Sequence, residues 1–273
     1  PEVDYVGGRV LPEWSDEPPS WLTPAHWSPL ALTDHGDAPF YVDKNKTVCL
    51  VGANLAFRRE VFNQFGLFDP DCQRVRDGIG STEDHELQLR LWRAGIRGLY
   101  VPAAIVTAAV QAERTTRKYH RRWHAGHGKF CAKMRLNEIT DAHGRATGEW
   151  TNLATLFGVP GYIYRELLRE GACWLSAVMR WESTSSEREH QVRYWFGYVG
   201  ERWRQNAAER RHSVPAEFVT FTKLVLRKKA AARRSVTLTT AQLRDELNPL
   251  RRNASLASHT HNEIVRETSG HAV

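Results

Sequence analysis

The spacing of hydrophobic positions along the chain changes near residue 113. Before that point, short apolar runs alternate with turn residues, a pattern typical of buried strands, as at residues 3–10 and 47–51. The segment 52–54 (Gly-Ala-Asn) predicts a tight turn, because glycine and asparagine adopt unusual backbone angles and let a ligand approach closely. Residues 58–65 predict a short helix that ends at Gly66. This part of the chain therefore has the pattern of an α/β structure.

Helical spacing replaces the strand pattern beyond residue 113. It predicts helices at about 114–136, 160–182, 187–211 and 215–233. The second of these interleaves apolar residues with arginines, which is typical both of a helix packed on a core and of one lying on an anionic membrane. We favour packing against the first part of the chain and keep membrane contact as the alternative. Beyond about Asn248, the Ser, Thr, Asn and His content predicts a disordered tail.

Another helix is predicted to begin near residue 82. Ser81 and Thr82 are favourable N-cap residues, and Gly95 predicts the end of the helix. Apolar residues at helical spacing predict that one face packs on a core: Leu87, Leu89, Leu91, Trp92 and Ala94. The first turn of this helix is therefore expected to be held rigidly.

That first turn carries Glu83, Asp84 and Glu86. The helix dipole favours anions there and lowers the pKa of a carboxyl group. Acids are common at helix starts, so this local pattern does not by itself distinguish a catalytic carboxylate from an ordinary cap. Other parts of the sequence must decide between these interpretations.

The segment from Pro12 to Lys46 is rich in proline, aspartate and tryptophan, which predicts a long irregular loop. Its tryptophans, Trp14, Trp21 and Trp27, suit stacking against the apolar face of a sugar ring or a base. They suit anchoring of the loop to the core equally well. Both interpretations stay open at this point.

Composition places the chain among ordinary globular proteins, with 41% hydrophobic and 25% charged residues in 273. The four cysteines lie far apart without a CxxC pair, which favours free thiols in a reducing compartment over a disulfide or zinc framework. The sequence has no apolar run long enough for a membrane span and no signal-peptide pattern ahead of Pro1. Because Pro1 leads directly into a strand pattern, the sequence is expected to start within a domain.

Charge divides the chain at the same place as hydrophobic spacing does. Residues 1–113 hold 10 Lys and Arg against 16 Asp and Glu, a net charge of −6, whereas residues 114–273 hold 28 against 15, a net charge of +13. A boundary near Glu113 follows. We therefore expect three parts: an α/β part at 1–113, a basic helical extension at 114–234 and a disordered tail at 235–273.

The order of several short strings resembles family-2 nucleotide-sugar glycosyltransferases of the GT-A fold. Each string is weak alone, but the order and spacing match that fold over roughly residues 3–130. The strings are Val6-Gly7-Gly8-Arg9-Val10, residues 52–59, Phe65-Gly66-Leu67-Phe68-Asp69, Thr82-Glu83-Asp84, Arg90-Leu91, Ala94-Gly95 and Tyr100-Val101-Pro102. The resemblance implies a partial GT-A-like, Rossmann-like mixed sheet with helices, and it makes residues 1–113 the acceptor side of a catalytic domain.

The resemblance also implies an activity. Such an enzyme transfers a hexose from a nucleotide diphosphate sugar to an acceptor hydroxyl, with inversion, and the acid matching Asp84 is the general base. Glu83 is carried over as a partner of the acceptor hydroxyl. Gly52, Ala53 and Asn54 match the segment that lines the acceptor and donor-sugar side of the pocket.

Two further residues and one departure follow from the resemblance. Arg114 and Tyr119 match a basic loop that closes over the diphosphate, where an arginine would stabilise the departing anion. Family members bind a divalent metal, Mg²⁺ or Mn²⁺, through an aspartate-rich motif ahead of the stretch that resembles residues 6–8, and the present sequence does not include that half. The strand after Pro102 also lacks the histidine that usually follows it. The 273 residues are therefore expected to be a C-terminal part that lacks the metal ligands and is inactive when isolated.

Three histidines, His120, His124 and His127, follow one another at i, i+4 and i+7 on the helix predicted at 114–136. This spacing places three imidazoles along one face and suits a transition metal. The surrounding arginines and lysines oppose cation binding, so we favour a solvated basic face or a phosphate-contacting segment, and no metal site is assigned.

The expected partners are a nucleotide-sugar donor and a glycan or lipid-linked acceptor, in the cytoplasm or at the inner face of the plasma membrane. The alternative is a non-catalytic basic helical module that binds an anionic membrane or nucleic acid through residues 114–234. The basic run at 227–234 would contribute to that surface, although a solvated helix end is the commoner explanation. Nucleic acid is the less expected partner.

Overall fold

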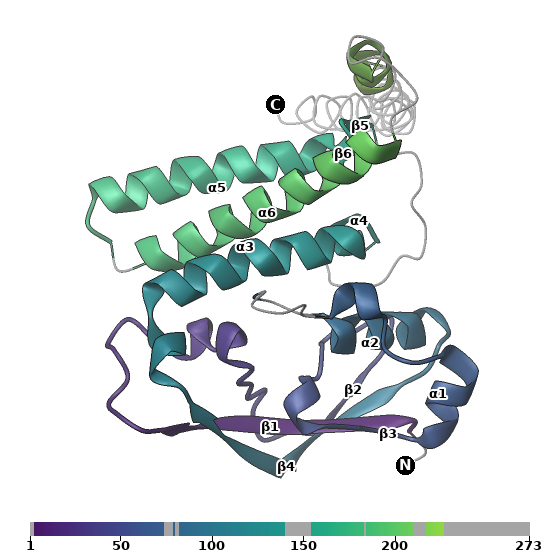
Figure 1. Cartoon of the computed structure of the whole chain (residues 1–273), viewed down its shortest axis with the longest axis vertical. Helices are drawn as coiled ribbons and strands as arrows, with labels where there is room; N and C mark the ends of the chain where they lie inside the picture. The colour runs from purple at the N-terminus through teal and green to yellow at the C-terminus, as the bar shows by residue number, and fades with distance from the viewer. Residues whose placement is uncertain are drawn as a thin grey trace, which may run out of the picture. The chain divides into compact units, whose positions relative to one another are not determined.

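The computed structural model describes residues 3–73, 79, 82–139, 154–182, 184–209 and 217–226. The chain forms two compact units, residues 1–214 and residues 215–273. The first is a mixed α/β structure with a helical region after the sheet (Figure 1). In the second, residues 217–226 are helical, within the helix predicted at 215–233. The run at 227–234 and the tail at 235–273 lie outside the described residues. The predicted division at 113 falls inside the first unit, and the three-part organisation stays a prediction.

The first unit is built on a mixed four-stranded sheet with the order β2-β4-β1-β3. β1 (Tyr5–Trp14) and β4 (Gly98–Val110) are parallel and form its centre, while β2 (Phe40–Val42) and β3 (Leu55–Phe57) are antiparallel to their neighbours. The register of β1 against β4 shifts between Gly7 and Arg9. Gly8 fits this point because a Cβ there would lie 2.0 Å from the carbonyl oxygen of Ala104. The sheet confirms the predicted α/β class with a partial GT-A-like arrangement.

Helices α1 (Arg59–Phe65) and α2 (Glu83–Arg93) accompany the sheet. α2 begins after Thr82 and is followed by Gly95 with φ +81°, as its sequence predicts. Its residues Leu87 and Leu91 are fully buried in the core that includes Tyr5. Trp92 donates its Nε1–H to the Tyr5 hydroxyl at 2.7 Å, which joins the helix to the sheet. Packing of these residues against the sheet thus holds α2 in place.

The strand predicted at 47–51 does not form. The backbone N–H of Leu50 donates to Oε1 of Gln88 at 2.9 Å, and its carbonyl accepts from Nε2 of the same side chain at 2.8 Å. A buried apolar run therefore satisfies its polar backbone with an amide side chain from α2 instead of a neighbouring strand. Gly52–Asn54 forms a short 3-10 turn, η3, as the predicted tight turn requires.

The proline- and tryptophan-rich segment contains more regular structure than expected. β1 extends to Trp14, and two 3-10 helices follow, η1 (Pro24–His26) and η2 (Ser28–Leu30). The tryptophans pack on a buried cluster made of Val10, Leu22, Leu30, Leu32 and Val110. This packing favours anchoring of the loop over stacking on a ligand.

The helical region begins with η5 (Ala112–Thr115) and α3 (Arg117–Lys133), followed by α4 (Leu136–Ile139). After a small hairpin of β5 (Thr155–Leu156) and β6 (Val159–Pro160) come α5 (Gly161–Met179) and α6 (Ser185–Glu209). Their bounds lie within a few residues of the helices predicted at 114–136, 160–182 and 187–211. α6 lies between α3 and α5 (Figure 1), and Ile139 of α4 packs with Leu89 and Trp92 of α2.

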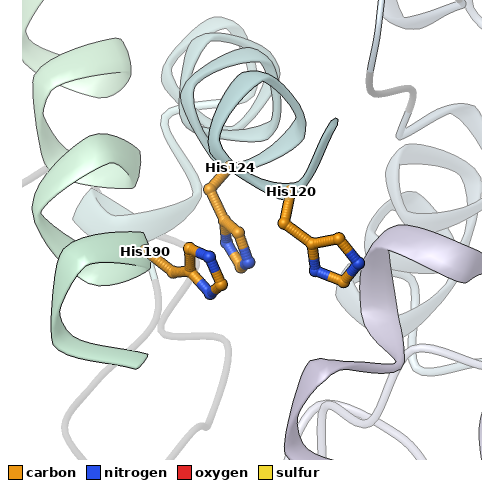
Figure 2. A group of neighbouring side chains, drawn as sticks. All are labelled: His120, His124 and His190. Carbon is orange, nitrogen blue, oxygen red and sulfur yellow. The ribbon is translucent and has the colours of Figure 1, made fainter. Parts of the chain in front are cut away.

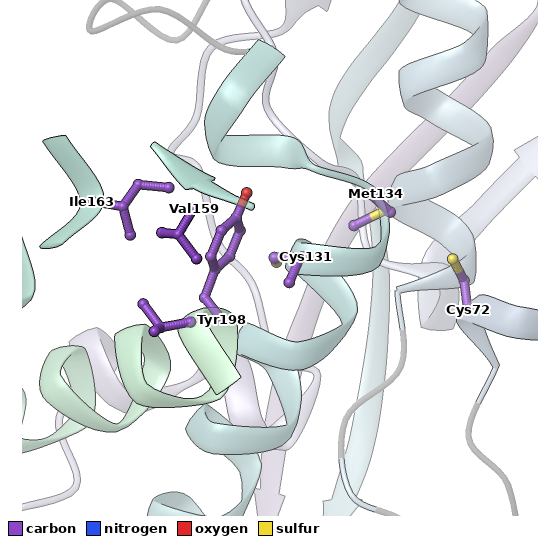
Figure 3. Packing of buried hydrophobic residues seen from close by; sticks show 8 residues of the cluster. Cys72, Cys131, Met134, Val159, Ile163 and Tyr198 are labelled. Atoms are coloured by element: carbon purple, nitrogen blue, oxygen red, sulfur yellow. The ribbon is translucent and has the colours of Figure 1, made fainter. Parts of the chain in front are cut away.

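One core joins this helical region to the α/β part. Cys131 of α3 and Tyr198 of α6 are buried in a cluster that also includes Cys72, from η4 (Pro70–Cys72) (Figure 3). The Tyr198 hydroxyl donates to the buried carboxylate of Glu138 at 3.0 Å. Arg202 pairs with the same carboxylate at 2.9 Å, so its charge is compensated. Cys131 and the other cysteines are free thiols, as predicted.

Within the part of the chain that the structure describes, each helix is too short or too polar to cross a membrane.

Candidate functional site

A cavity of about 390 Å³ opens beside the start of α2. Its wall comes from four places: η2 and the residues after it, the segment around Cys49 and Val51, the first turn of α2, and the stretch from η5 into α3. These segments are far apart in sequence. Asp84 is the only carboxylate among the described residues that line the cavity.

Asp84 is held by two backbone donors. Its Oδ2 accepts a hydrogen bond from the N–H of Gly52 at 2.8 Å, and its Oδ1 accepts one from the N–H of His85 at 2.8 Å. Burial raises the pKa of Asp84 above its ordinary value, and these two bonds oppose the shift. The helix dipole alone predicts a lowered pKa for Asp84, and the structure corrects that expectation. The loss of hydration on burial raises the pKa more than the hydrogen bonds at the helix start lower it.

Gln88 fixes the segment that supplies the Gly52 donor. Its fully buried side chain binds both backbone groups of Leu50 and also donates to the carbonyl of Asp84 at 3.0 Å. Residues 50–52 are thereby held against the first turn of α2. Sequence reasoning did not identify Gln88, because a glutamine one turn after an acid resembles any polar helix position.

Arg114 and Tyr119 line the same cavity as Asp84. The Nε–H of Arg114 donates to the Tyr119 hydroxyl at 3.1 Å, and a terminal N–H donates to the carbonyl of Pro29 at 2.8 Å. Tyr119 also donates to that carbonyl, at 3.2 Å. The pair therefore holds the cationic group in a defined place at the edge of the cavity.

The other residues predicted for the site separate into two groups. Gly52 contacts Asp84, and a Cβ at this position would lie 3.3 Å from Oδ2 of Asp84. Ala53 and Asn54 do not line the cavity, and the Asn54 amide donates to the carbonyls of Arg9 and Ala104, at 2.8 and 2.9 Å. The Asn54 amide thus bridges β1 and β4 at the point where their register shifts. Glu83 also does not line the cavity.

Several cavity residues were not predicted. His85 follows Asp84 directly, and burial lowers its pKa to about 4. His127 stacks on Trp123 with ring centroids 4.5 Å apart, and burial lowers its pKa to about 3. Both imidazoles are neutral at pH 7. His85 had the clearest sequence signal, since it adjoins the predicted base.

The three histidines of α3 do not share one environment. His120 is fully buried, which contradicts the solvated face expected for it, whereas the neighbouring Lys118, Arg122 and Lys129 are exposed. The cations therefore occupy the outer side of α3. His120 and His124 face His190 of α6, and His127 belongs to the cavity of Asp84.

Residues 1–126 match the family model described as glycosyltransferase like family 2. A search of curated proteins and a search of solved structures each found no match. The matched segment contains the whole four-stranded sheet, α2 and the first part of α3, and with them Asp84, Arg114 and Tyr119. The family match supports a transferase function that acts on a nucleotide-sugar donor and an acceptor. The match to glycosyltransferase family 2 therefore covers residues 1–126, the part of the chain that contains the candidate site.

Proposed function

We propose that the protein transfers a hexose from a nucleoside diphosphate donor to an acceptor hydroxyl with inversion, and that Asp84 is the general base. The observation that carries the proposal is the position of Asp84, which supplies the only carboxylate of the described cavity wall beside Arg114 and Tyr119. An inverting transfer needs one base on the acceptor side and positive charge near the leaving group. The cavity offers one group for each task.

The environment of Asp84 suits a base. A sugar hydroxyl becomes a sufficient nucleophile when a carboxylate removes its proton as the new bond forms. Burial makes Asp84 a stronger base than an exposed aspartate, and the Gly52 and His85 N–H groups keep the carboxylate in one orientation. Each carboxylate oxygen can accept a further hydrogen bond, so a donor hydroxyl can still approach.

Arg114 is proposed to stabilise the departing diphosphate. Among the described residues, two of its hydrogen bonds go to Tyr119 and Pro29, and a guanidinium has five N–H groups in total. The remaining donors suit phosphate oxygens. The Tyr119 hydroxyl keeps the guanidinium oriented, so Tyr119 acts as a positioning residue.

Members of this family typically use a divalent metal. Mg²⁺ and Mn²⁺ prefer several oxygen ligands, and the described wall of this cavity supplies one carboxylate, Asp84, whose two oxygens already accept backbone hydrogen bonds. These residues do not fit such an ion. No step of the proposed reaction is therefore assigned to a metal here.

The test is the substitution Asp84→Asn in the full-length protein, assayed by release of the nucleoside diphosphate from a panel of nucleotide sugars. Asparagine keeps the size of the side chain but does not accept the proton, so kcat is expected to fall by about 10²- to 10⁴-fold. Glu60→Gln is the matched control, since Glu60 is an exposed acid in the first turn of α1. An unchanged rate in Asp84→Asn would show that another group is the base.

A second function is supported by one surface. Leu168, Leu175 and Met179 lie along one side of α5 with 73%, 58% and 81% of their side chains exposed, and Trp181 follows at 94%. The exposed arginines Arg165, Arg169 and Arg180 flank this face. We propose that the face lies on an anionic membrane surface, so that the protein is cytoplasmic and peripheral to the membrane.

This surface proposal has its own test. The double substitution Leu175→Glu and Met179→Glu should abolish sedimentation with vesicles that contain phosphatidylglycerol, while transfer to a soluble acceptor stays unchanged. Leu67→Glu is the control, because Leu67 is 74% exposed and far from α5 in sequence. Equal binding to neutral vesicles, or equal loss in the control, would reject the proposal.

A further inference from the structure

Three histidines from two helices meet beneath the basic outer face of α3. His120 and His124 come from α3 and His190 comes from α6 (Figure 2). One ring nitrogen of each lies within 4.8 Å of the corresponding nitrogens of the other two. The rings of His124 and His190 are stacked with centroids 4.5 Å apart, and those of His120 and His190 are 5.7 Å apart.

The close crossing of α3 and α6 builds this cluster. A Cβ on Gly128 would lie 2.0 Å from the carbonyl oxygen of Tyr194, and a Cβ on Gly197 would lie 2.0 Å from that of Ala125. The two backbones can touch only because both positions lack a side chain. This contact draws the preceding turns together, and with them His124 and His190.

The cluster contains buried nitrogens that lack hydrogen-bond partners. Within the described residues, this holds for both ring nitrogens of His120 and for Nε2 of His124. His120 is fully buried and His190 is 3% exposed. A buried polar atom without a partner costs about 1–3 kcal/mol. Such atoms on α3, gathered beside His190 of α6, indicate a ligand that accepts lone pairs.

We propose that His120, His124 and His190 bind one divalent transition-metal ion of the Zn²⁺ type. Imidazole nitrogen is a preferred ligand of Zn²⁺, Co²⁺, Ni²⁺ and Cu²⁺ and a poor one for Mg²⁺ and Ca²⁺. A tetrahedral zinc site needs Zn–N distances of about 2.0–2.1 Å, which places its nitrogens about 3.4 Å apart. Closing the three nitrogens from separations of up to 4.8 Å to this spacing requires rotation about χ2, an angle that is broadly distributed for histidine.

His26 lies beside the cluster but is not one of its three members. It is 4% exposed, its ring centroid lies 5.5 Å from that of His190, and its Nε2 lacks a partner among the described residues. Its Nδ1 lies 3.1 Å from the Thr23 hydroxyl. The same Nδ1 accepts a hydrogen bond from the Thr23 backbone N–H at 3.4 Å, which leaves the proton of the neutral ring on Nε2, so His26 is not assigned as a ligand.

The charges around the cluster do not oppose a cation as strongly as the sequence suggests. The Arg121 guanidinium pairs with Glu189 at 2.8 Å, and Arg193 shares the same carboxylate at 2.9 Å. Arg117 lies over the ring of Trp21, 4.9 Å from its centroid. Positive charge near the cluster is thus partly neutralised by Glu189, next to His190 in the sequence.

The imidazoles are also in the protonation state that a metal requires. Burial, reinforced by the neighbouring histidines, lowers the pKa of His120 to about 4, while the backbone of Arg114 has a weak opposite effect. Burial lowers the pKa of His190 to about 4 as well. Neutral rings bind an ion at pH 7 without first releasing a proton.

An ion could reach the cluster from one side. The wall of a cavity of about 300 Å³ includes Trp123, His124 and His127 of α3 and Gln191 and Tyr194 of α6. Once bound, the ion would link α3 to α6 and so attach the helical region to the end of the family segment. This role is structural, and it does not depend on the proposed transfer reaction.

The test uses Co²⁺ as a spectroscopic probe and Zn²⁺ as a competitor. The full chain, freed of metal with a chelator, is titrated with Co²⁺ in a background where tail histidines are replaced, His259→Gln, His261→Gln and His271→Gln. We expect one Co²⁺ per chain with visible d–d absorption, its displacement by Zn²⁺, and a higher Tm with Zn²⁺ but not with Mg²⁺.

Two substitutions distinguish the third ligand suggested by helical spacing, His127, from the third ligand found in the structure, His190. His190→Gln should weaken Co²⁺ binding by at least about 100-fold, whereas His127→Gln, on the same helix as His120 and His124, should leave it within about threefold. His190→Cys, which restores a zinc ligand, should recover Zn²⁺ binding and shows that a loss in His190→Gln is not unfolding. Absence of one-to-one binding in the parent chain, or an equal loss in His127→Gln, would overturn the proposal.

Discussion

The cavity of Asp84 and the cluster of His120, His124 and His190 both use α3, yet they are assembled by different forces. The carboxylate is positioned by a hydrogen bond from the Gly52 N–H, and Gln88 holds the segment that supplies this donor. The histidines are positioned by the crossing of two helices whose backbones touch. Loss of these hydrogen bonds should therefore displace Asp84 and leave the histidine cluster unchanged. A substitution at the helix crossing should displace the histidines before it displaces Asp84.

The two assemblies also differ in how far they can be found from sequence. Asp84 lies in a string whose neighbours follow in a fixed order, so the family resemblance locates it. His190 joins its partners only through tertiary packing. This difference explains why helical spacing offered His127 as the third member of the cluster, whereas the structure brings in a residue from another helix.

The largest expected effect comes from Gly197→Ala at the crossing. The new methyl group would meet the Ala125 carbonyl at 2.0 Å, and backbone cannot move aside as a flexible side chain can. We expect the free energy of unfolding to fall by about 3 kcal/mol or more, measured by urea denaturation. Metal binding at the cluster should weaken in the same variant.

Gly200→Ala is the control for that substitution. Gly200 is also in α6, but a Cβ there would meet no atom within 4 Å. Because alanine has the better helix propensity, this change should stabilise the protein by about 0.5–1 kcal/mol. Equal effects at the two positions would mean that the helices do not cross as closely as described.

Much of the fold could be predicted from local pattern. The periodicity of residues 83–93 and the glycine that follows them predict α2, and the long apolar spacing predicts α3, α5 and α6. The segment 47–51 was predicted as a strand because its side chains are apolar, and the error has a physical cause. Apolarity reports burial, but only the tertiary structure shows that Gln88 supplies the hydrogen bonds.

The candidate site was predictable to a lesser degree. Gly52, Asp84, Arg114 and Tyr119 are brought together in the structure, whereas Asn54 was misplaced. An asparagine at a turn looks available to a ligand, but its amide is used by two backbone carbonyls. Whether any of these residues has its proposed role stays a prediction.

An intermediate effect is expected from Gln88→Leu, which keeps the side-chain volume but removes the amide. The buried N–H and carbonyl of Leu50 would lose their partners, which should lower the free energy of unfolding by about 2 kcal/mol. Because Gly52 would no longer be held against Asp84, kcat should fall by about 10- to 100-fold with little change in KM.

The exposed Gln64 of α1 provides the control for that variant, since Gln64→Leu also replaces a helical glutamine. It should leave kcat and metal binding unchanged. Gln88→Leu should spare Co²⁺ binding at the histidine cluster, and a comparable loss at both sites would contradict their independent assembly.

The smallest expected effect is a pH dependence of stability at Asp84. Since burial raises the pKa of this carboxyl above 3.8, its contribution to folding is fully present below that pH and is lost as the pH rises through the folded-state pKa. Asparagine does not ionise, so the stability of Asp84→Asn relative to the parent should increase between about pH 3 and pH 7. Urea denaturation across this range measures the difference, and Glu60→Gln shows the effect of removing an exposed charge. A decrease in the relative stability of Asp84→Asn over this range would mean that the hydrogen bonds from Gly52 and His85 lower the pKa more than burial raises it. Asp84 would then be a weaker base than its burial in the cavity implies.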